Sequence, residues 1–140
     1  LLFIVLYDLR HTIVPPAASS LLICSAILFL YVTSTSLISL GLVLFVAGSI
    51  SLFFFLLHAL SRGRAMGLGD APVALGLSLL VGSQAIAGLL FSFWTGALFG
   101  ICLLLARRGG PTMGIEIPFV PFMAFGYLLA YITQWNPLLF

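Results

Sequence analysis

Three clusters of arginine divide the chain into long apolar runs, and this pattern restricts the possible folds more than any other feature. All five basic residues are arginines: Arg10, Arg62, Arg64, Arg107 and Arg108. Of the 140 residues, 63% are hydrophobic and 6% are charged. A soluble domain is roughly a quarter charged, and so few charges cannot cover the surface of one. The sequence therefore predicts a single membrane-embedded domain that spans residues 1–140.

Hydropathy predicts an all-α fold, a polytopic transmembrane bundle of about six helices with the first one truncated. The first span is the run 1–7, which is too short to cross a bilayer because crossing takes about 20 helical residues. We therefore expect the sequence to be a fragment that lacks an N-terminal part. The other five spans are predicted at residues 18–36, 40–60, 72–91, 94–106 and 119–135. Glycines in the fourth and fifth spans are predicted to allow close helix packing: Gly76, Gly82, Gly88, Gly96 and Gly100.

The arginine clusters also predict a topology. They follow the first, third and fifth spans, whereas the junctions near residues 33–39 and 92–95 and the end after residue 135 carry no charge. The positive-inside rule places arginine-bearing junctions in the cytoplasm. We therefore expect a multi-pass protein of the inner (cytoplasmic) membrane, with Tyr31, Trp94 and Trp135 near the opposite interface.

Several kinds of partner and cofactor are not expected. No basic face is dense enough to neutralise a row of phosphates, so nucleic-acid binding is excluded. Cys24 and Cys102 lie inside apolar runs and are interpreted as small hydrophobic residues. His11 and His58 are too far apart in the sequence to suggest a metal site, and each is assigned an interfacial, non-catalytic role. No cofactor and no metal are predicted.

The chain contains only three acidic residues, Asp8, Asp70 and Glu116. In the predicted topology all three lie at cytoplasmic ends of spans. A carboxylate near the hydrocarbon boundary is costly and is therefore a candidate for function. The plainer alternative is that Asp8 pairs with Arg10, and Asp70 with Arg64, as interfacial ion pairs.

The residues around the two aspartates favour a chemical role. Gly67 and Gly69 precede Asp70 and leave room for a close approach of backbone or substrate, because neither has a Cβ atom. Asp8 is expected at the same depth on a separate helix. Two neighbouring carboxyl groups can share one proton. One can then act as a base toward water and the other as an acid toward a peptide carbonyl. This pair is sufficient for aspartyl peptide hydrolysis.

Three segments in this order resemble the type IV prepilin peptidases, a family of GxGD-type membrane aspartyl proteases. They are Asp8–Pro15, with an Ile-Pro-like pair after the aspartate, the GxGD motif Gly67–Asp70, and the proline-rich Ile117–Phe122. Members cleave the basic leader of type IV prepilins or pseudopilins at the cytoplasmic membrane face, in pilus assembly or type II secretion. The resemblance implies prepilin or pseudopilin substrates held beside the lipid bilayer.

By this resemblance, Asp8 and Asp70 are the catalytic pair, and Gly67 and Gly69 shape the substrate site. Glu116 could attract the basic leader, or it could pair with a loop arginine. The chain departs from the family in lacking a lysine shortly after Asp70 and in carrying Val120 where the late motif usually has glycine. No paired cysteines match those linked to N-methyltransferase activity in many members, so only peptidase activity is predicted.

Two other functions compete with this one. The pair Tyr7-Asp8 followed by Gly67–Asp70 also resembles presenilin- or signal-peptide-peptidase-like intramembrane proteases, but the late Ile117–Phe119 segment fits prepilin peptidases better. A non-enzymatic small transporter or scaffold is the second alternative. A transporter more often places ionisable groups near the bilayer midplane, whereas the acids here are predicted at one edge.

Overall fold

The computed structural model describes residues 1–11, 14–33, 36–63, 67–106 and 118–134. Within these ranges the regular elements are six α-helices and one short 3-10 turn, so the predicted all-α bundle is confirmed. They are α1 (Leu2–His11), α2 (Pro16–Thr33), α3 (Leu37–Leu60), α4 (Asp70–Val81), η1 (Gly82–Gln84), α5 (Ala85–Ala106) and α6 (Val120–Thr133).

The helices match a lipid environment in both length and surface. Among the described residues, three stretches are long and apolar enough to cross a membrane: Pro16–Thr33, Leu37–Leu60 and Asp70–Leu105. Large apolar side chains cover the outside of the bundle, where Phe45 is 74% exposed and Leu105 is 78% exposed. A soluble monomer does not present apolar surface on this scale. The chain is therefore a membrane protein.

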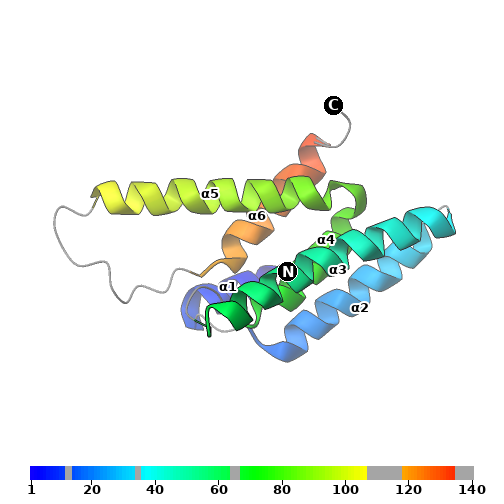
Figure 1. Cartoon of the computed structure of the whole chain (residues 1–140), viewed down its shortest axis with the longest axis horizontal. Helices are drawn as coiled ribbons and strands as arrows, with labels where there is room; N and C mark the ends of the chain where they lie inside the picture. Colours follow the sequence, from blue (N-terminus) through cyan, green and yellow to red (C-terminus); the bar gives the residue numbers. More distant parts are fainter. Residues whose placement is uncertain (12–13, 34–35, 64–66, 107–117, 135–140) are drawn as a thin grey trace.

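α4 lies at the centre of the bundle. It contacts α2, α3, α5 and α6, and Figure 1 shows it between the α5–α6 pair and the helices α2 and α3. Eight of its 12 residues are buried. Small residues allow its neighbours to approach: a Cβ atom on Gly76 would lie 2.8 Å from Cγ of Leu22 in α2. The centre of the bundle is thus built on small side chains, as is common between membrane helices.

The junction between the fourth and fifth spans differs from the predicted one. It lies at η1 instead of at residues 92–95, and α5 continues through Ser92. Gly82 ends α4 with φ +62° and ψ −117°, a conformation that side-chain-bearing residues rarely adopt. The Ser92 hydroxyl donates to the Gly88 carbonyl at 2.6 Å, so this polar group has a partner within the helix. The predicted spans 72–91 and 94–106 are therefore replaced by a short α4 and a long α5.

The helix ends alternate between the two sides of the bundle as the topology requires. In Figure 1 the end of α2, the start of α3 and the α4–α5 junction lie toward the right, whereas α3 and α5 end toward the left. Arg62 follows α3 and Arg10 lies in the last turn of α1. The left-hand end therefore carries these arginines, and its placement in the cytoplasm stays a prediction.

Candidate active site

Asp8 is turned into the bundle by the last turn of α1. Its side chain is 4% exposed, whereas Leu9 and Arg10 beside it are exposed. The backbone N–H of Val120, the first residue of α6, donates to the Asp8 carboxylate. Burial raises the pKa of Asp8 above its ordinary value, and the Val120 N–H offsets part of this effect. An interfacial ion pair with exposed Arg10 does not account for such a buried carboxyl group.

Asp70 is held by the glycine turn that opens α4. Its side chain is 7% exposed. The Asp70 backbone N–H donates to the Gly67 carbonyl at 3.3 Å, and the Gly67 N–H in turn donates to the Asp70 carboxylate. A carboxylate in the first turn of a helix is further stabilised by the helix dipole. The GxGD sequence therefore begins the helix and fixes its acid in one local unit. Arg64, its predicted ion-pair partner in the plainer alternative, lies outside the described residues.

The two glycines of this turn have different surroundings. A Cβ atom on Gly67 would lie 3.8 Å from Oδ2 of Asp70, which is an ordinary contact. A Cβ atom on Gly69 would lie 2.7 Å from Cβ of Val14, which is a clash. Gly69 thus allows the segment after Asp8 to pack directly against the GxGD turn. Gly69 therefore lies against Val14, whereas Gly67 lies beside the Asp70 carboxyl group.

Asp8 and Asp70 lie close enough for the charge of one to act on the other. His58, in the last turn of α3, has the opposite electrostatic effect on Asp70, because it favours the ionised carboxylate. Oδ2 of Asp8 is buried and has no hydrogen-bond partner among the described residues. A buried acceptor without a partner is unusual and can receive a proton from a bound water or substrate group. The geometry thus supplies two neighbouring carboxyl groups for acid–base work.

Sequence reasoning placed the acids but missed two groups that act on them. Val120 was noted only as a departure from a motif, because a backbone N–H leaves no trace in a side-chain pattern. His58 was assigned a non-catalytic interfacial role, and only the folded position of α3 brings it near Asp70. Glu116 lies outside the described residues, so its predicted role stays a prediction.

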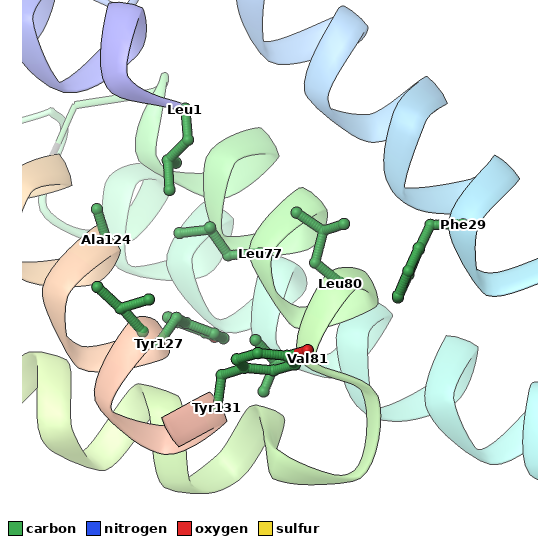
Figure 2. A pocket seen from close by; sticks show the side chains of 9 residues that line it. Leu1, Phe29, Leu77, Leu80, Val81, Ala124, Tyr127 and Tyr131 are labelled. Carbon is green, nitrogen blue, oxygen red and sulfur yellow. The ribbon is translucent and has the colours of Figure 1, made fainter. Parts of the chain in front are cut away.

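A separate pocket of about 230 Å³ lies between α2, α4 and α6, beside Leu1. Figure 2 shows apolar side chains around it, among them Phe29, Leu77 and Leu80. Tyr127 and Tyr131 also border it, but neither aspartate does. With this lining the pocket offers apolar surface and no acid–base pair.

A family model described as the type IV leader peptidase family matches residues 1–105. The matched region contains both aspartates and the GxGD turn, whereas α6 lies beyond it. None of the curated proteins and none of the solved structures compared with the chain gives a match.

Proposed function

The chain belongs to the type IV leader peptidase family, and we propose that it is a membrane aspartic endopeptidase with Asp8 and Asp70 as its catalytic pair. Its substrates would be type IV prepilins or pseudopilins, cut between the basic leader and the apolar helix. The observation that best supports the pair is that both carboxyl groups are buried and that the charge of Asp8, distant in sequence, acts on Asp70. Neither the transporter nor the scaffold alternative accounts for this pair in a peptidase family.

The proposed reaction starts with one proton shared between the two carboxyl groups. The ionised carboxylate accepts a proton from water as the water oxygen attacks the scissile carbonyl carbon. The protonated carboxyl group donates its proton to the carbonyl oxygen. The tetrahedral intermediate then collapses, the C–N bond breaks, and the amine leaves with a proton from the first carboxyl group. The second carboxyl group recovers its proton, so the enzyme returns to its starting state.

The proposed orientation places this site at the cytoplasmic membrane face. The arginine-bearing ends of α1 and α3 support it through the positive-inside rule. A basic leader would then remain in water near the acids while the apolar helix of the prepilin remains in lipid. In this proposal Gly67 leaves space for substrate beside Asp70, and Glu116 attracts the positive charges of the leader.

The proposal is tested by co-expression of the full-length protein with a candidate prepilin in cells that lack their own prepilin peptidase. A gel reports the size of the pilin. We expect conversion to the shorter form, and weaker conversion when the leader lysines and arginines are replaced by glutamine. If the protein inserts into the membrane but leaves a panel of prepilins and pseudopilins uncut, the proposed substrate class is wrong.

A further inference from the structure

The N-terminus of α6 meets the candidate active site, although it lies beyond the region matched by the family model. The contact is made by the main chain: the N–H of Val120 donates to the Asp8 carboxylate. Val120 is the first residue of α6. A first-position N–H has no partner within its own helix, so it is free to bind an acceptor from elsewhere. The positive end of the α6 dipole therefore points to one acid of the pair.

The packing around α6 fixes this N–H in place. The Val120 side chain is fully buried and belongs to a core cluster that includes Ile4 of α1 and Val73 of α4. The residue before it, Phe119, lies with its ring centre 5.5 Å from that of Phe93 in α5 and 5.9 Å from that of Phe54 in α3. The start of α6 is thus held against four other helices.

The two acids consequently have different hydrogen-bond partners. Asp70 receives its N–H from the turn that also opens its own helix. Asp8 receives its N–H from a helix that follows more than a hundred residues later. A donor on a separate, firmly packed helix can orient Asp8 relative to Asp70 in a way that local structure cannot.

We propose that the N-terminus of α6, through the backbone N–H of Val120, is a positioning element that holds the Asp8 carboxyl group in the orientation that it needs as the base of the catalytic pair. This inference rests on the proposed function for its catalytic meaning. The interaction itself can be tested without any cleavage assay.

The first test removes only the N–H. Proline fits the first position of a helix, where its missing N–H breaks no helical bond, so Val120→Pro deletes the donor. Val120→Ala is the reference, because it shortens the same side chain but keeps the N–H. Relative to V120A, we expect V120P to lower kcat for prepilin cleavage about tenfold or more, with KM within about twofold, as expected for loss of a hydrogen bond to a charged group. We also expect the acid limb of the kcat/KM profile to move to higher pH.

The second test does not depend on catalysis. Asp8 and Asp70 are the only aspartates of the sequence, so protein labelled with ¹³C at aspartate carboxyl carbons reports on both, with assignment by Asp8→Asn and Asp70→Asn. We expect V120P to raise the titration midpoint of Asp8 relative to V120A, and to move that of Asp70 less. This result would hold even if prepilins proved to be the wrong substrate.

Proline could disturb the chain before it, because Phe119 has helical angles (φ −90°, ψ −24°) that a following proline disfavours. If V120P does not insert, an ester bond at the same position, introduced with the α-hydroxy analogue of valine, removes the N–H and keeps the side chain. Equal Asp8 midpoints and equal rates with and without the N–H would overturn the proposal. A fall in rate with an unchanged Asp8 midpoint would also overturn it, because the effect would then be structural.

Discussion

Asp8 and Asp70 are both almost fully buried, at 4% and 7% exposure, and the charge of Asp8 acts on Asp70. Two carboxylates in this relationship repel each other, and burial adds a further cost to each charge. One proton bound to the pair relieves this cost. The proposed reaction uses the same proton. The repulsion and the cost of burial also affect the stability of the protein, and this effect does not depend on any substrate.

We expect Asp8→Asn to stabilise the protein at neutral pH. Burial raises the pKa of Asp8 above its unfolded value of 3.8. At this group the folded state therefore binds more protons than the unfolded state. The contribution of Asp8 to the free energy of unfolding is thus most favourable at low pH and falls as pH rises through the folded pKa. Thermal unfolding in detergent should show a Tm gain for D8N that is larger at pH 7 than at pH 4. A D8N protein less stable than wild type at pH 7 would contradict this account of the buried carboxyl group.

Alanine substitutions in the glycine turn should separate packing from space for substrate. Gly69→Ala places a Cβ atom 2.7 Å from Val14 Cβ, so we expect a loss of about 1–3 kcal/mol from overpacking. Displacement of Asp70 should also reduce cleavage about tenfold or more. Gly67→Ala makes only an ordinary contact at 3.8 Å and should be folded as stably as wild type.

The matched control for these variants is Gly48→Ala in α3, where an added Cβ atom meets nothing within 4 Å. Alanine there should be neutral or stabilising by up to about 1 kcal/mol. Urea or thermal unfolding in detergent measures all three variants. A G69A protein as stable and as active as G48A would show that Val14 does not pack tightly against the turn.

Ser78 and Tyr127 share a hydrogen bond of 2.8 Å between α4 and α6, and both side chains are fully buried. Ser78→Ala leaves the tyrosine hydroxyl without this partner, and we expect a cost of about 1–3 kcal/mol. Tyr127→Phe should cost less, because a serine hydroxyl can bond to its own helix backbone. The double variant should be less destabilised than the sum of the two single variants. Strict additivity in thermal unfolding would argue that the two hydroxyl groups do not interact.

Much of the fold followed from the sequence because hydropathy and glycine positions carry direct physical information. The packing role predicted for the glycines is confirmed at Gly76 and Gly88, where an added Cβ atom would lie 2.8 and 2.6 Å from a neighbouring side chain. At Gly96 the nearest atom would lie at 3.5 Å, an ordinary contact. The predicted role is wrong at Gly82, which ends α4, and at Gly100, which faces open space. Glycine alone does not reveal whether a position meets another helix, a turn or lipid.

The misplaced junction has a similar cause. The polar Ser92 suggested a break in the apolar run, but its hydroxyl bonds within α5. The segment Gly82–Gln84, which does break the helix, is polar as well, so residue type alone did not distinguish a helix break from a polar position inside a helix. At the site, side-chain chemistry indicated both aspartates, whereas the Val120 N–H depends on how α6 packs against α1 and could not be predicted from residue types.

The most direct test of the central claim is cleavage of a prepilin by purified Asp8→Asn and Asp70→Asn variants, each in parallel with Gln84→Ala. Gln84 is as buried as the aspartates, at 8% exposure, but lies at the α4–α5 junction away from them, so Q84A controls for loss of a buried polar group. Size-exclusion profiles and thermal unfolding establish that each variant is folded. We predict that folded D8N and D70N each lose at least about a thousandfold in kcat while Q84A cleaves. A folded D8N or D70N protein that cleaves at a rate comparable with Q84A would contradict the two-aspartate site.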